Sequence, residues 1–149
     1  MTKTLSHIIF VTLTAISTCA SGEDFVVNML NQGNDGVMVF EPSVLAISVG
    51  DTVTFKPTNP GHNSASIAGM IPAGASSWDG SMSQEVKVTF SAEGTYVYQC
   101  TPHLMMAMVG VITVGDASVN LNAVKEAANE KKSEFMMSAQ RLDDYLKGI

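Results

Sequence analysis

The chain has 149 residues and a formal net charge of −6, which suits one domain with a proper core and is short for two. Residues 23–116 carry nine acidic residues against two lysines, whereas residues 117–149 carry five acidic and five basic residues. This distribution leaves no basic patch for nucleic acid or an anionic membrane, so both classes of binding protein are excluded.

Residues 1–22 have the three regions of an export signal. Lys3 gives a positive start, residues 5–16 are largely apolar, and small residues follow at 17–22. The apolar run is too short to span a bilayer. We therefore expect a signal peptide at 1–22, cleaved after Ala20 or Gly22, rather than a buried N-terminal strand or helix.

Cys19 offers a second interpretation of this region, in which the mature chain is anchored by a lipid. The residues before it, Ile16-Ser17-Thr18, match a lipid-attachment motif poorly, so we favour simple cleavage. Removal of the signal leaves one cysteine, Cys100, and two histidines, His62 and His103. An exported chain with a single cysteine forms no internal disulfide, and metal binding is the natural role for that thiol.

The next part of the chain has short apolar or β-branched segments separated by turns that contain Gly, Pro and Asn. The expected strands are 25–30, 37–40, 44–49, 52–56, 86–90, 95–99 and 109–114. Such strands at close spacing predict an antiparallel β-sandwich or barrel over residues 23–116. Residues 68–83 show neither helical nor strand periodicity and predict a long irregular connection. Trp78 in this segment could belong to the core, anchor the surface or take part in an interface, and we favour the core.

Residues 117–149 carry helical periodicity and are expected to form an extension of the same domain. Two stripes recur at helical spacing: Leu121, Val124 and Ala128, then Phe135, Ala139, Leu142 and Leu146. We expect two short helices packed on the sandwich, with N-caps at Asn120 or Asn122 and at Ser133. Met136 and Met137 lie on or beside the second stripe and are predicted to fill the core rather than bind a ligand.

The chemistry is concentrated in residues 100–108, which read Cys-Thr-Pro-His-Leu-Met-Met-Ala-Met. A thiolate beside an imidazole suits copper, zinc or an iron–sulfur cluster, and a thioether at a fixed distance favours copper. A blue-copper centre needs a second imidazole, and His62, after the turn Pro60-Gly61, can supply it. Asn63 is placed to join the two loops and to hydrogen-bond near the thiolate.

Several alternatives stay open at this point. Taken singly, each histidine or the cysteine could be an ordinary buried residue. Spacing to the following strand favours Met108 as the weak fourth ligand, but Met105 and Met106 lie close by. A copper storage or delivery protein with an exposed Cu(I) site is a second functional class, and a zinc-filled or metal-free interaction module is a third.

These residues resemble the pseudoazurins, periplasmic type 1 copper proteins of the cupredoxin family. The matching stretches are 28–31, 38–42, 50–55, 61–63, 70–72, the ligand loop and the two C-terminal helices. The resemblance implies a cupredoxin-like Greek-key β-sandwich with two C-terminal α-helices. It also implies an electron carrier, not an enzyme, with one type 1 copper on His62, Cys100, His103 and Met108.

The resemblance further implies an apolar docking patch through which electrons pass at His103. Its expected members are Met38, Pro57, Gly61, Pro102, Leu104, Met105 and Met106. Pseudoazurins typically surround this patch with lysines and deliver electrons to a copper nitrite reductase. Here uncharged or acidic residues take the corresponding positions, so a copper nitrite reductase and a c-type cytochrome both remain candidate partners of an expected monomer.

Overall fold

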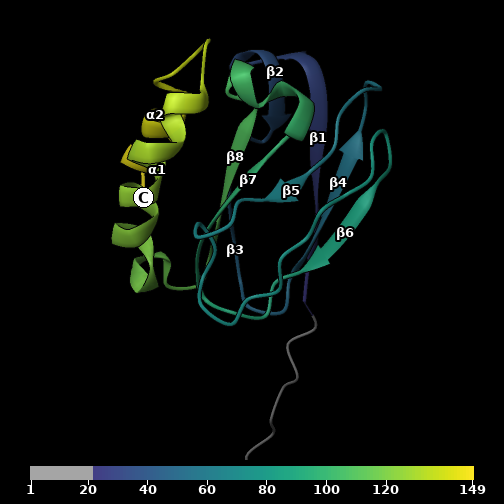
Figure 1. The fold of residues 1–149 in the computed structure, drawn as a ribbon. Helices are drawn as coiled ribbons and strands as arrows, with labels where there is room; N and C mark the ends of the chain where they lie inside the picture. Colours follow the sequence, from purple (N-terminus) through teal and green to yellow (C-terminus); the bar gives the residue numbers. More distant parts are fainter. Residues whose placement is uncertain (1–21) are drawn as a thin grey trace, which may run out of the picture.

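The computed structural model describes residues 22–149. Residues 1–21 of the predicted signal peptide lie outside the described residues. Within that range, no helix has the length and apolar character needed to cross a membrane. Two four-stranded sheets face each other, and two helices lie along the outer side of one of them (Figure 1). The molecule is thus built in three layers.

The strands and helices follow in chain order. The strands are β1 (Asp24–Gly33), β2 (Gly36–Glu41), β3 (Val44–Ile47), β4 (Thr52–Pro57), β5 (Ala65–Ser66), β6 (Val86–Thr89), β7 (Gly94–Gln99) and β8 (Val109–Val114). The 3₁₀-helices are η1 (Thr101–Met106), η2 (Ala117–Val119) and η3 (Lys132–Glu134), and the α-helices are α1 (Leu121–Lys131) and α2 (Arg141–Lys147).

One sheet has the strand order β2-β1-β4-β6 and the other has the order β3-β8-β7-β5. The neighbours β1 and β4 are parallel, as are β3 and β8, so the expectation of a purely antiparallel sandwich is wrong at these two pairs. Apolar alternation along a strand indicates which face is buried but carries no information about its partner. The short strand β5 was also not expected.

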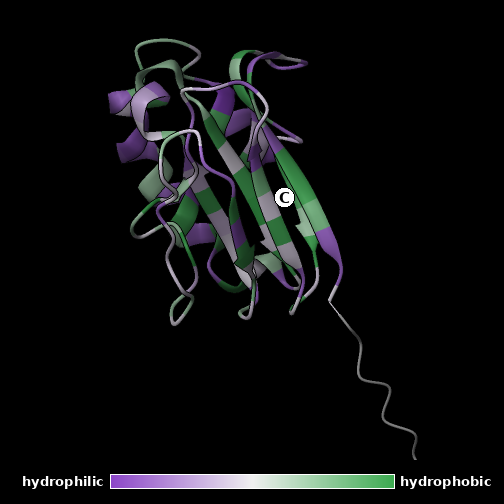
Figure 2. Ribbon diagram, turned by 90° about the vertical axis from the view of Figure 1, so that its right-hand side faces the viewer, coloured by the Kyte–Doolittle hydropathy of each residue, from purple (hydrophilic) through white to green (hydrophobic). Residues whose placement is uncertain are grey.

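Strand β7 lies at the centre of the fold and is buried on both faces. Its side chains alternate, so Tyr96 and Tyr98 pack between the two sheets, whereas Val97 packs in the cluster beneath the helices. Figure 2 shows alternating green and paler bands along the strands that face the viewer. Continuing the alternation by two residues places Cys100 between the sheets, in the same cluster as Tyr98.

The core between the sheets is rich in aromatic side chains. The rings of Phe55 and Trp78 are stacked, with centroids 5.7 Å apart, and Tyr98 packs edge-on against Phe55 at 4.9 Å. Trp78 Nε1 donates a hydrogen bond to Ser64 Oγ at 3.0 Å, which satisfies its polar atom. The prediction that Trp78 belongs to the core is confirmed in part, because Trp78 is partly buried and packs against this cluster.

The second cluster joins the helices to the sheet that contains β7 and β8. Val124 and Ala128 of α1 and Leu142 and Leu146 of α2 are buried there, as their periodicity predicts. The second helix begins at Arg141, however, and not near Ser133, which lies in η3. Asn120 is at the N-terminus of α1 but does not cap it, since its side chain bonds to the backbone of Thr95.

The prediction for Met136 and Met137 is wrong, because both side chains are exposed. Phe135, in extended conformation at the end of η3, takes the buried position. The chain then runs irregularly to α2, with Ser138 in the left-handed region at φ 52°. The helical stripe assumed for this segment is therefore interrupted, and Ala139 is exposed as well.

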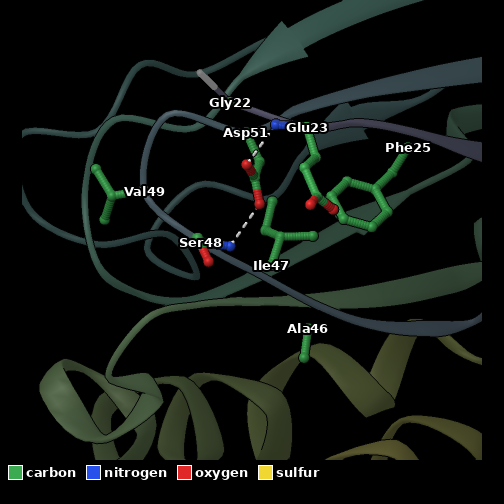
Figure 3. Close-up of a pocket in the computed structure, with 8 residues that line it drawn as sticks. All are labelled: Gly22, Glu23, Phe25, Ala46, Ile47, Ser48, Val49 and Asp51. Carbon is green, nitrogen blue, oxygen red and sulfur yellow. Dashed lines mark hydrogen bonds between the residues drawn. The ribbon is translucent and has the colours of Figure 1, made fainter. Parts of the chain in front are cut away.

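Asp51, just before β4, organises one end of the sandwich (Figure 3). Its carboxylate is buried and accepts hydrogen bonds from the backbone N–H groups of Glu23 and Ser48, both at 2.7 Å. These bonds tie the start of β1 to the turn between β3 and β4, beside a hollow lined by Phe25, Ile47 and their neighbours. His62 follows the other end of β4, where the candidate metal site lies.

Candidate metal site

The loop after β7 is held at both of its ends. Cys100 N donates to Met108 O at 2.9 Å, and Met108 N donates to His103 O at 3.2 Å. Pro102 sits in the first turn of η1, where a missing N–H costs nothing, and Ala107 ends this helix in the left-handed conformation. Strand β8 then begins at Val109, so the loop is closed between two paired strands.

Three candidate donor atoms converge at this end of the sandwich. The Nδ1 atoms of His62 and His103 are 3.1 Å apart. Cys100 Sγ lies 3.7 Å from Nδ1 of His62 and 3.4 Å from Nδ1 of His103. These side chains come from two loops that are 38 residues apart in the sequence.

The spacing of the three atoms fits a transition metal. A point equidistant from atoms spaced in this way lies about 2 Å from each, close to the length of a bond from a metal to imidazole nitrogen or thiolate sulfur. His62 and Cys100 are buried, whereas His103 is partly exposed. Two imidazoles and one thiolate are the equatorial donor set of a blue-copper site.

His62 is oriented by a residue that the sequence analysis did not identify. Its Nε2 lies 2.8 Å from Asn31 Oδ1, which can only accept, so Nε2 carries the proton and Nδ1 keeps its lone pair. Asn31 is itself held, because its backbone N–H donates to Asn59 Oδ1 at 2.9 Å. Burial, together with the nearby His103, lowers the pKa of His62, which favours the neutral imidazole that a metal requires.

Asn63 connects the His62 loop to the Cys100 loop. Its Oδ1 accepts from Thr101 N at 2.8 Å, and its Nδ2 donates to Thr101 Oγ1 at 3.1 Å. Burial raises the pKa of the Cys100 thiol, while backbone hydrogen bonds from Asn63 and His103 act in the opposite direction. A metal ion must therefore displace the thiol proton on binding, and the two N–H groups assist by stabilising the thiolate.

Comparison with known proteins agrees with this donor set. Residues 27–115 match the copper binding proteins of the plastocyanin/azurin family. The chain is 40% identical over 124 residues to the pseudoazurin of Methylorubrum extorquens, covering 83% of this chain and 80% of that protein. It is also 40% identical over 114 residues to the pseudoazurin of Paracoccus pantotrophus, covering 76% of this chain and 79% of that protein. The chain belongs to the pseudoazurins.

A solved structure supports the same assignment. The pseudoazurin of Methylobacterium extorquens has a TM-score of 0.75 and 38% identity to this chain, covering 85% of this chain and 98% of its own. The predicted cupredoxin-like sandwich with two C-terminal helices is thus confirmed. As a member of this family the protein is a blue copper electron carrier, and copper is its cofactor.

The three methionines of the loop differ in their surroundings. Met108 is buried in the same core cluster as Cys100. Met105 is exposed, and Met106 is partly exposed. A weak axial ligand must lie inside the site with the thiolate, so burial favours Met108 over its two neighbours.

Arg141, a second residue that the sequence analysis did not single out, braces the loop from the helical layer. Its guanidinium is buried and donates to the carbonyls of Ala107 at 2.9 Å and Met106 at 3.3 Å. It also donates to the carbonyl of Met38 at 3.0 Å and to those of Asp35 and Val37. One side chain therefore joins the start of α2 to the ligand loop and the β1–β2 hairpin.

The residues of the expected docking patch lie at or near the surface. Pro102 and Met105 are exposed, and the remaining members are partly exposed: Met38, Pro57, Gly61, Leu104 and Met106. Met38 has a left-handed backbone with φ 49° and contacts the core beneath the patch. Four members of the patch belong to η1 and flank His103 in the sequence: Pro102, Leu104, Met105 and Met106.

Proposed function

We propose that His62, Cys100, His103 and Met108 hold one copper ion and that the mature protein works in the periplasm as a one-electron carrier. When bound, copper supplies a one-electron couple between Cu(II) and Cu(I). The convergence of two imidazole nitrogens and one thiolate sulfur, all within 3.7 Å of one another, supports this function most directly.

The surrounding hydrogen bonds suit a carrier, since they restrain the donor side chains. Asn31 holds His62, and the double contact between Asn63 and Thr101 holds the two loops together. Such contacts keep donor side chains in place and tune their basicity. We therefore expect little movement of the chain on reduction, which lowers the barrier to electron transfer.

At this centre, the burial of three of the four donors favours electron transfer over copper storage or delivery, which would use exposed donors. Four donors from the chain also leave no coordination position for a substrate. Metal catalysis normally needs such a position, so we expect no enzymatic activity at this centre.

The assignment of Met108 can be tested by comparing it with a neighbour in the same loop. Met108→Leu removes a buried thioether and should change the visible spectrum of the Cu(II) protein. Met106→Leu is the matched control and should leave that spectrum largely intact. If Met106→Leu changes the spectrum and Met108→Leu does not, the axial ligand is Met106.

Electrons are proposed to pass through the partly exposed His103 and the apolar patch around it. Weak redox complexes use small interfaces, for which a patch of this kind is sufficient. The predicted positions for a lysine ring hold Gln32, Asn59, Pro60, Asp79 and Gln99. Encounter with a partner should therefore rely little on basic side chains, whether that partner is a copper nitrite reductase or a c-type cytochrome.

The charges of the adjacent helical layer also indicate that few basic side chains are available to a partner. Lys131 pairs with Glu134 at 3.1 Å, and Lys132 pairs with Asp143 at 2.8 Å. These two lysines are thus neutralised within the chain. The chain therefore offers little attraction to an acidic partner, and we expect the rate of electron transfer to such a partner not to fall as ionic strength rises.

The electron self-exchange rate, measured from NMR line broadening in mixtures of oxidised and reduced protein, tests the proposed route. Leu104→Lys places a charge in the patch and should slow self-exchange strongly, because two copies must bring their patches together. Val26→Lys is the matched control, since Val26 is exposed on β1 outside the patch. Equal slowing by both variants, or by neither, would refute the route through this surface.

A further inference from the structure

Three methionines, one in the ligand loop and two beside it, are exposed to solvent. The exposed fractions are 57% for Met105, 79% for Met136 and 49% for Met137. None of the three fills the core, and the proposed copper centre uses none of them. Large apolar side chains gathered at one exposed place call for a functional explanation.

The backbone holds these residues together. The carbonyl oxygen of Met105 accepts hydrogen bonds from Met136 N at 2.8 Å and from Met137 N at 3.0 Å. Figure 1 shows the corresponding arrangement, with the connection between η3 and α2 at the same end of the molecule as η1. Three thioether side chains therefore start from neighbouring points of two segments that are about 30 residues apart in the sequence.

The two segments are also fixed on either side of this contact. Phe135, directly before the methionine pair, is buried in the cluster beneath the helices. Arg141, shortly after the pair, donates to the carbonyls of Met106 and Ala107 in the ligand loop. The positions of the three methionine backbones are therefore set by the fold, while the side chains themselves are exposed to solvent.

Three thioether side chains that start from neighbouring backbone positions suit a particular class of ligand. Sulfur of this kind is a soft and neutral donor, which selects Cu(I) over harder ions such as Zn²⁺ or Mg²⁺. Methionine has three rotatable bonds and adapts its position readily, so three sulfurs that start from adjacent backbones can close on one ion. A purely apolar docking surface would be made equally well by leucine, whereas a soft cation needs the sulfur.

We propose that Met105, Met136 and Met137 form a second metal site, at the surface, that binds Cu(I). This site is distinct from the buried centre, and it lies beside it because Met105 is two residues after His103. It would hold an incoming Cu(I) ion next to the loop that supplies the buried donors. The proposal does not depend on the route of electron transfer.

Anaerobic titration of the fully reduced, copper-loaded protein with Cu(I), in competition with a chromophoric Cu(I) chelator, tests the site. The buried centre is already filled, so the wild type should bind one further equivalent. The triple variant Met105→Leu/Met136→Leu/Met137→Leu should lose that equivalent, because leucine preserves the apolar volume and removes the sulfur. Met82→Leu is the matched control and should retain it, since Met82 is 48% exposed but lies in another part of the chain.

The visible band, the number of Cu(I) equivalents bound and the self-exchange rate together decide the result. The visible band of the oxidised protein should be the same in all variants, which shows that the fold and the buried centre are intact. A wild type that binds no further equivalent, or a triple variant that still binds it, would overturn the proposal. If the triple variant keeps the second equivalent but slows self-exchange, the methionines serve docking instead. The titration and self-exchange outcomes leave the assignment of the buried centre unchanged, and only the visible band reports on that centre.

Discussion

The two ends of strand β4 each carry a buried polar side chain, and the two differ in how their polar atoms are used. Before β4, Asp51 accepts a backbone hydrogen bond on each carboxylate oxygen. After β4, His62 donates from Nε2 to Asn31 but directs Nδ1 toward His103 and Cys100. A buried group that only stabilises a fold is satisfied by the chain, whereas a site for a metal keeps lone pairs facing one another.

The largest effect is expected when the buried carboxylate before β4 is removed. Asp51→Ala leaves two backbone N–H groups without their charged acceptor and should lower the free energy of unfolding by about 3 kcal/mol. Urea unfolding of the copper-loaded protein measures this change. The exposed Glu85→Ala serves as the control and should unfold like the wild type.

The visible spectrum of the copper-loaded Asp51→Ala variant should be unchanged, because Asp51 and the metal site lie at opposite ends of β4. A spectrum that changes along with the stability would show that the two ends are not independent.

A smaller effect is expected when the oriented histidine loses its hydrogen-bond acceptor. Asn31→Ala frees Nε2 of His62 and should weaken copper binding about tenfold, since such contacts orient the ligand and raise its basicity. Competition with a chelator of known affinity measures the change. The neighbouring Gln32→Ala should have no effect, because the side chain of Gln32 is exposed and, among residues 22–149, bonds only to Gly33 O. Equal weakening by both variants would count against a specific role for Asn31.

Most of this architecture could be predicted from the sequence, because strands and ligand residues leave patterns within short segments of the chain. Short apolar or β-branched segments between turns identified the strands that became β1, β4, β7 and β8, and the donor types in residues 100–108 indicated copper. The parallel pairs were missed, since the partner of a strand depends on contacts far apart in the sequence. The irregular segment before α2 was missed for a similar reason, because two of its backbone N–H groups bond to Met105 instead of continuing a helix.

The residues missed around the site share one property. Asn31 is an exposed asparagine near the end of β1, and nothing in its neighbourhood indicates that it contacts a histidine 31 residues later. Arg141 lies in a helix whose charged residues balance, and its five carbonyl partners are 34 to 106 residues away. A polar residue whose partners are distant leaves no periodic pattern, so only the fold can reveal its role.

The most direct test of the account is the visible absorption spectrum of the mature protein with Cu(II), before and after addition of ascorbate and after reoxidation. We predict an intense band from thiolate to copper that bleaches on reduction and returns on reoxidation, and that is absent in Cys100→Ser. A colourless protein that nevertheless binds Cu(I), or a band that survives Cys100→Ser, would contradict a carrier built on His62, Cys100 and His103.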